Sequence, residues 1–137
     1  MKLKSLLLTG LTLVILSVMG TKTQAQISPQ FIGRFSTGVY DKAAAEISAY
    51  DVTTKRMFVN NGSDTSIKVV NISNPASPVL LSVISLKPYG SDITSIASKN
   101  GIIAAAVIDS LGKTANGKIV FFNASTLAYI SQVKVGA

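Results

Sequence analysis

Two segments of this chain share one strand–turn–strand pattern, and this internal repeat constrains the fold more than any other feature. The first copy is IKVVNISNPASPVLL at 67–81, where a β-branched run meets an asparagine, a proline-containing turn and a second apolar run. The second copy is KIVFFNASTLAYISQV at 118–133, in which Asn123 stands 52 residues after Asn71. Short strands that recur at such an interval are typical of a β-propeller blade or a related array.

Strand and turn patterns along the rest of the chain complete two units of four strands. In the first unit, apolar runs predict strands at 46–50, 56–60, 67–72 and 79–84. In the second unit, they predict strands at 93–97, 102–108, 118–122 and 128–133. We therefore predict an all-β fold made of about two four-stranded antiparallel blades of an incomplete β-propeller. A small β-sandwich is the alternative.

The second unit has strands that are apolar on both faces. IIAAAVI at 102–108 and KIVFF at 118–122 lack the polar alternation of a strand that is exposed on one side. A propeller blade between two neighbours is covered on both faces, so both of its faces are apolar. We expect this unit to require a neighbour on each side.

The first 25 residues have the pattern of a secretory signal peptide. Lys2 and Lys4 precede an apolar run at 6–19, and the small side chains that follow predict cleavage between Ala25 and Gln26. The apolar run is shorter than the roughly 20 residues that span a bilayer, so a retained membrane anchor is the alternative. The predicted organisation is a signal peptide at 1–25, an extended lead-in at 26–45, a blade at 46–86 and a second blade at 87–137.

Composition excludes several kinds of chemistry. The chain has no histidine and no cysteine, which rules out Ser-His-Asp and Cys-His catalysis, the usual zinc ligands and a disulfide framework. The formal net charge is +7, but the basic residues are scattered and only Lys55 and Arg56 are adjacent. Without a basic stripe interleaved with aromatic residues, nucleic acid is not an expected partner.

Few residues have the type and context of a ligand site. Asp41 and Glu46 precede a strand of the kind that lines a propeller channel, and their oxygens are suited to a divalent cation. The alternatives for this pair are an ion pair with Lys42 or Arg34, or simple exposure to solvent. Gly112-Lys113-Thr114 lacks the earlier glycine of a phosphate-binding loop, so we interpret it as an ordinary loop. No catalytic residue and no required cofactor is predicted.

Several blocks of this sequence, in this order, resemble one family of secreted proteins. VVNISNPASP at 69–78 is similar to repeats in which a Leu-Val-Ile-Val-Asp strand ends at Asp-Ile-Ser-x-Pro. The blocks TGVYDKAAAEISAYD (37–51), MFVNN (57–61) and YGSDITSIASKNGIIAAAV (89–107) resemble the N-terminal part of the choice-of-anchor I β-propeller proteins. Asn71 and Asn123 depart from the pattern, because they stand where that family usually has aspartate.

The resemblance implies a secreted or cell-surface propeller module for binding or scaffolding. It also implies that this chain is the N-terminal part of a larger protein, attached to the surface through a C-terminal region beyond it. The expected partners are the remaining blades or neighbouring chains. The alternative that it implies is part of a metal-assisted hydrolase of the alkaline phosphatase or esterase kind, in which a divalent cation would act with residues of the further blades.

Overall fold

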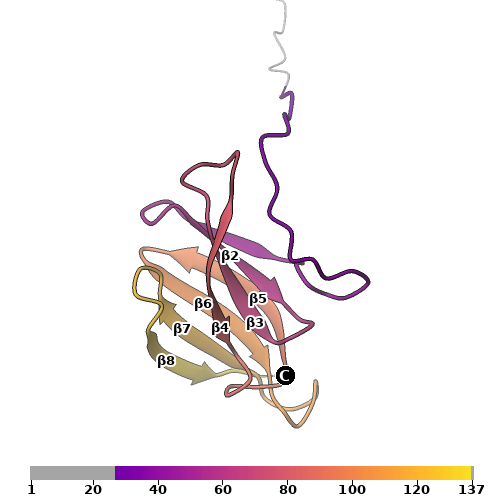
Figure 1. Cartoon of the computed structure of the whole chain (residues 1–137). Coiled ribbons are helices and arrows are strands. Elements are labelled where there is room, and N and C mark those ends of the chain that lie inside the picture. Colours follow the sequence, from indigo (N-terminus) through magenta and orange to yellow (C-terminus); the bar gives the residue numbers. More distant parts are fainter. Residues whose placement is uncertain (1–26, 137) are drawn as a thin grey trace, which may run out of the picture. The chain divides into compact units, whose positions relative to one another are not determined.

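The computed structural model of this chain describes residues 27–136, and both of its β-sheets belong to one unit that begins at Ile32. Each sheet has four antiparallel strands, and no helix occurs in the described range (Figure 1). The predicted all-β class with two four-stranded sheets is confirmed. The first sheet contains β1 (Ser48–Asp51), β2 (Arg56–Asn61), β3 (Ser66–Asn71) and β4 (Val79–Ser85). The second contains β5 (Asp92–Lys99), β6 (Ile102–Ile108), β7 (Lys118–Asn123) and β8 (Tyr129–Lys134).

In both sheets the strands lie side by side in chain order, β1-β2-β3-β4 and β5-β6-β7-β8. Each sheet is therefore a meander, with connections that range from the tight turn at 100–101 to the longer loops at 72–78 and 109–117. At the connection between β5 and β6, Asn100 and Gly101 both have positive φ (51° and 76°), as the Asn-Gly sequence predicts.

The predicted strand boundaries hold to within one or two residues, with one informative difference at the start of β1. The sequence pattern predicts a strand from Glu46, but β1 begins at Ser48. The side chain of Asn60 takes the place of a strand partner there. Its Oδ1 accepts hydrogen bonds from the backbone amides of Glu46 (3.1 Å) and Ile47 (2.6 Å). Regular pairing of β1 with β2 therefore begins only at Ser48, opposite Val59.

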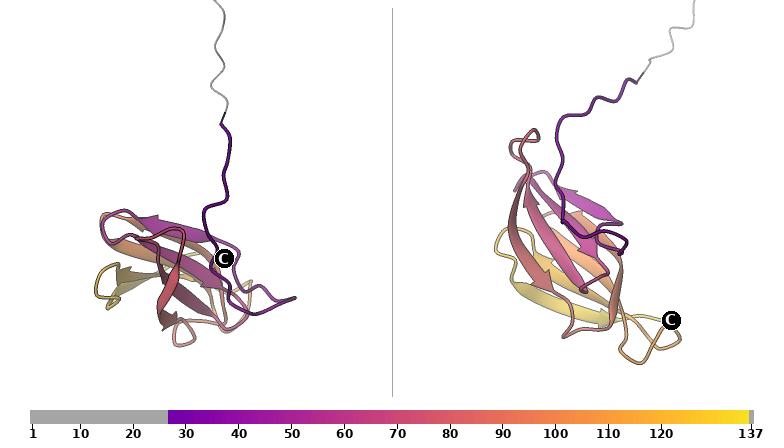
Figure 2. Two further views of the ribbon diagram at one scale, coloured as in Figure 1. Left: turned by 45° about the horizontal axis from the view of Figure 1, so that its top comes forward. Right: turned by 45° about the vertical axis from the view of Figure 1, so that its right-hand side comes forward.

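The core lies between the two sheets, where β1 and β2 pack against β5 (Figure 2). Branched and aromatic side chains from both sheets fill it, and most are buried completely. The cluster consists of Phe58, Ile67, Val69, Leu86, Ile93, Ile96, Ile103, Ala105, Val107, Val120, Phe122 and Ala124. Burial of these apolar side chains is the main source of stability in a chain without disulfides.

The two sheets repeat each other in detail. The register between the third and fourth strands shifts at Val69/Val70 in the first sheet and at Phe121/Phe122 in the second. Both bulges lie at the same distance from the strand-end asparagines, Asn71 and Asn123. The repeat seen in the sequence is thus a structural repeat, with Val69 corresponding to Phe121.

Corresponding residues of the two sheets point in opposite directions relative to the shared core. Where a residue of one sheet points into the core, its counterpart in the other sheet points away from it. In β3, Ile67 and Val69 face the second sheet, whereas their counterparts in β7, Ile119 and Phe121, lie outside the core cluster. In a sandwich of two equivalent sheets, both sets would face inward. The head-to-tail relation is that of successive propeller blades, in which one face of each blade packs on the opposite face of the next.

The described residues contain no membrane-spanning helix and do not include the predicted signal peptide. Within residues 27–136, no helix has the length and the apolar character needed to cross a membrane. The predicted signal peptide and its cleavage point between Ala25 and Gln26 lie outside the described residues.

Candidate functional site

The most prominent candidate for a binding site is the side of the second sheet that is turned away from the first sheet, here called the outer face. The cross-strand register places six apolar side chains on it: Ile102, Ala104, Ala106, Ile119, Phe121 and Val133. Ile102 and Val133 are 43% and 53% exposed, and the other four are half-buried. Lys99, Asn123 and Ser131 share this face at the strand ends and on the edge strand β8. An apolar sheet centre of this kind is characteristic of an interaction surface.

The structural repeat shows what this outer face is suited to bind. In the first sheet, the corresponding face is covered by the second sheet, and its central pair is Phe58 with Val69. On the outer face, the same central positions are occupied by Ala104 and Phe121, which are also direct cross-strand partners. Ala104 in β6 thus stands where β2 has the larger Phe58, and Phe121 in β7 stands where β3 has the smaller Val69. Both central positions therefore stay apolar.

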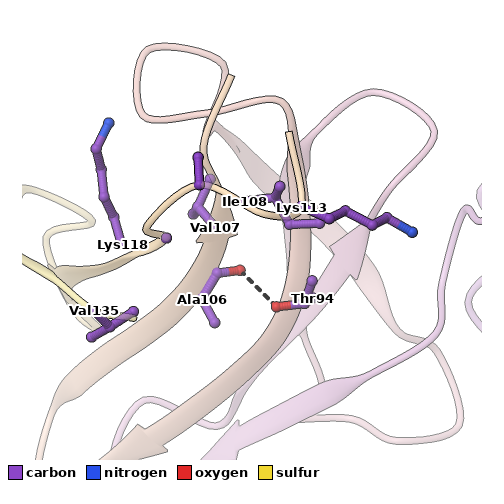
Figure 3. A pocket seen from close by; sticks show the side chains of 9 residues that line it. Thr94, Ala106, Val107, Ile108, Lys113, Lys118 and Val135 are labelled. Carbon is purple, nitrogen blue, oxygen red and sulfur yellow. Dashed lines mark hydrogen bonds between the residues drawn. The ribbon is translucent and has the colours of Figure 1, made fainter. Parts of the chain in front are cut away.

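A shallow hollow of about 150 Å³ lies at one end of the outer face (Figure 3). Thr94 and Ala106 line it from neighbouring strands, and the Thr94 hydroxyl donates to the Ala106 carbonyl at 3.4 Å. The ammonium groups of Lys113 and Lys118 point away from each other in Figure 3. The lysines therefore do not form a two-pronged anion site, and the hollow is an extension of the apolar face.

Arg56 fastens the two sheets together at one edge of their interface. From the first residue of β2, its Nη1 donates to the carbonyl oxygens of Ala124 (2.9 Å) and Ser125 (2.7 Å) in the turn after β7. In the sequence, Arg56 stands out only as a neighbour of Lys55, and this role was not predicted. Backbone carbonyls carry no sequence pattern that would have identified its partner.

Carboxylate and amide side chains organise the turns at the ends of several strands. After β3, the Asn71 Oδ1 accepts hydrogen bonds from the amide (2.9 Å) and hydroxyl (2.7 Å) of Ser73. After β7, the Asn123 Oδ1 accepts from the amides of Ser125 and Thr126, both at 2.9 Å. These bonds need only an acceptor oxygen, so asparagine serves at both positions as well as aspartate would.

The Asp51 carboxylate closes the turn after β1 and has a perturbed pKa. Its Oδ2 accepts hydrogen bonds from the hydroxyl (2.7 Å) and the amide (2.9 Å) of Thr54. These bonds lower the pKa of Asp51, with a further contribution from the charge of Arg56, its cross-strand partner. Asp51 therefore acts as the acceptor that closes its own turn.

Two other aspartates form the ion pairs found among residues 27–136. Burial raises the pKa of Asp64, but hydrogen bonds from Lys68 and Ser66 outweigh it and leave that pKa lowered. The backbone amide of Leu111 lowers the pKa of Asp109, whose Oδ2 lies 3.6 Å from the Lys118 ammonium. Both carboxylates act locally, within or beside their own turns.

The predicted cation ligands lie in the segment before β1. Asp41 is exposed and has a positive φ of 54°, and Glu46 is exposed with its amide bonded to Asn60. No group of three or more acidic, histidine or cysteine side chains is placed to hold a metal ion in the described part of the chain. Cation binding by Asp41 and Glu46 stays a prediction.

Comparison with known proteins identifies the family. The family model of the choice-of-anchor I domain matches residues 46–137, which include all eight strands. The chain belongs to the choice-of-anchor I family. Neither the curated proteins nor the solved structures contain a match.

The family assignment agrees with the resemblance predicted from the sequence, and the family name points to a domain associated with the cell surface. The matched range begins two residues before β1 and leaves out the extended segment that precedes it. The range that matches the family model is therefore the pair of stacked sheets.

Proposed function

We propose that this choice-of-anchor I domain is a secreted, cell-surface module that acts by binding and scaffolding, with no catalysis of its own. Its working surface in this proposal is the outer face of the second sheet. The ligand is another four-stranded blade, which stacks there as the second sheet stacks on the first.

The observation that carries the proposal is the equivalence of the two faces. The face of the first sheet built around Phe58 and Val69 is completely buried by a neighbouring sheet. The corresponding face of the second sheet, around Ala104 and Phe121, has the same strand register and the same bulge, and no sheet formed by residues 27–136 covers it. Since apolar burial drives both folding and association, a second blade is the partner that this face fits best.

Export supports the surface location. The basic residues Lys2 and Lys4, followed by the apolar run at 6–19, are typical of a secretory signal. A chain without cysteine gains no disulfides outside the cell, so its stability there depends on packing. Covering the outer face would add to that packing.

Binding of a hydrophobic fluorescent dye tests the proposed surface. We expect the wild-type chain to enhance the fluorescence of anilinonaphthalene sulfonate, and Ala104→Lys to reduce the enhancement by more than half, because a lysine in the centre of the face disrupts its apolar continuity. Thr53→Lys, which adds the same charge at an exposed turn, is the control and should behave like the wild type. Equal dye binding by all three proteins would contradict the proposed surface.

A further inference from the structure

The opposite end of the stack, the outer face of the first sheet, is covered by the chain itself. The cross-strand register places Lys68, Val70 and Leu80 on this face, turned away from the second sheet. Phe35, Thr37 and Val39 of the preceding segment line a hollow of about 380 Å³ together with Lys68 and Leu80. We call residues 33–39 the strap.

The shared lining of the hollow places the strap beside this face, and burial along both agrees with that placement. Val70 is only 1% exposed although it does not belong to the core cluster between the sheets, so it is covered from the outer side. Along the strap, Gly33, Phe35 and Thr37 are half-buried and the residues between them are exposed. This alternation is that of an extended chain with one side against a surface.

Close packing at Gly33 fixes the beginning of the strap. A Cβ atom at this position would overlap the carbonyl oxygen of Pro75 and would lie 3.0 Å from the backbone of Ala76. Both residues belong to the turn between β3 and β4. A larger residue at position 33 therefore requires the strap or the β3–β4 turn to shift.

The strap is held by side-chain packing alone. Among residues 27–136, the hydrogen bonds of 33–39 are local ones, such as those from the Gly38 amide to the Ser36 hydroxyl and from the Val39 amide to the Thr37 hydroxyl. The first backbone bond to the sheet appears at Ala43, whose carbonyl accepts from Ser63. A segment without ladder hydrogen bonds is among the first parts of a fold to open.

The covered face is equivalent to one that binds a blade. Lys68 and Val70 correspond, 52 residues on, to Val120 and Phe122, which are the residues that the second sheet packs against the first. The strap therefore occupies the position that a neighbouring blade occupies at the equivalent face. Its removal would expose the complement of the outer face of the second sheet.

We propose that the strap is a displaceable cap over a blade-binding face, and that the outer face of the second sheet of another copy of this chain docks there when the strap opens. This inference rests on the proposed function, because the docking surface is the same. Two complementary faces on one molecule allow head-to-tail growth, whereas pairing through a single face stops at two copies.

Thiol labelling of the full-length chain tests whether the strap covers this face and can open. The chain has no cysteine, so Val70→Cys introduces a single buried thiol on the face that the strap lies beside, next to Leu80. We expect Phe35→Ala or Gly33→Ala to accelerate labelling of this thiol about tenfold, because each weakens the contact of the strap with the sheet. Arg34→Ala, at an exposed strap position without a hydrogen bond of its own in the described range, is the matched control. An unchanged rate in both Phe35→Ala and Gly33→Ala would overturn the cap.

Sedimentation of the Phe35→Ala chain, without the added thiol, tests whether a second copy docks on the face that the strap covers. We expect its mass to increase with concentration beyond two copies, and addition of Ala104→Lys to abolish this growth. Growth that persists with Ala104→Lys would show unspecific aggregation and overturn the docking. Faster labelling without growth would also overturn the docking and count against the proposed function, whereas unchanged labelling counts against the cap alone.

Discussion

At the scale of single residues, the strand-end turns show how one acceptor oxygen determines local structure. Asn71, Asn123 and Asp51 follow different strands, yet each accepts hydrogen bonds from the residues just beyond it. Turn propensity made these positions predictable from the sequence. The roles of Arg56 and Asn60 were not predictable, because their partners are backbone atoms brought near by the fold.

Acid should destabilise the fold through Asp51. The native pKa of Asp51 lies below its ordinary value of 3.8, so the folded chain binds fewer protons than the unfolded chain in this range. Stability from a lowered pKa is complete above the unfolded value and is lost as the pH falls through the native value. We expect the urea midpoint of the wild type to fall as the pH is lowered from 3.8 through the native pKa of Asp51.

Asp51→Asn keeps an acceptor for Thr54 but does not titrate, and it should show a smaller fall over the same range. Asp64 and Asp109, whose pKa values are also lowered, account for the remaining acid dependence. Asp41→Asn, at an exposed position, is the control. An acid dependence in Asp51→Asn equal to that of the wild type would contradict this account.

At the scale of the elements, the sequence predicted the strands but not how their faces are used. Apolar runs located all eight strands. A strand that is apolar on both sides, such as β6, does not reveal which side meets a neighbour within the chain. That choice depends on the twist and stacking of whole sheets. The strap was predicted only as part of an extended lead-in, since it has no strand pattern of its own.

Adjacent alanines in β6 provide a sharp test of the assigned faces. Ala105 is completely buried between the sheets, whereas Ala104 lies on the outer face. Ala105→Lys should cost about 3–5 kcal/mol or prevent folding, because it buries an unpaired charge. Ala104→Lys should change the free energy of unfolding by less than about 1 kcal/mol. Urea denaturation followed by circular dichroism measures both, and equal costs would contradict the assignment.

At the scale of the whole molecule, the account predicts an exported protein. We expect mass spectrometry of the exported chain to show a mature N-terminus at Gln26, after loss of residues 1–25. Replacing the apolar run with a polar segment should retain the chain inside the cell. An intact Met1 on membrane-retained protein would instead support the uncleaved anchor.

An uncovered blade face lowers the free energy of unfolding of a domain of this size by a large fraction. At roughly 25 cal/mol per Å², several hundred Å² of apolar surface left in water forgoes on the order of 10 kcal/mol. This is comparable with the whole stability of a typical domain. The isolated chain should therefore be marginally stable or associate through this face, and a further blade should stabilise it.

Sedimentation equilibrium of the wild-type chain over a range of concentrations, with Ala104→Lys beside it, tests the central claim most directly. The stacked-blade account predicts reversible association of the wild type through the outer face, and a marked loss of association in Ala104→Lys. Thr53→Lys should associate like the wild type. A wild-type chain that stays monomeric at every concentration, with a cooperative melt above about 60 °C, would contradict the account and indicate a self-sufficient sandwich.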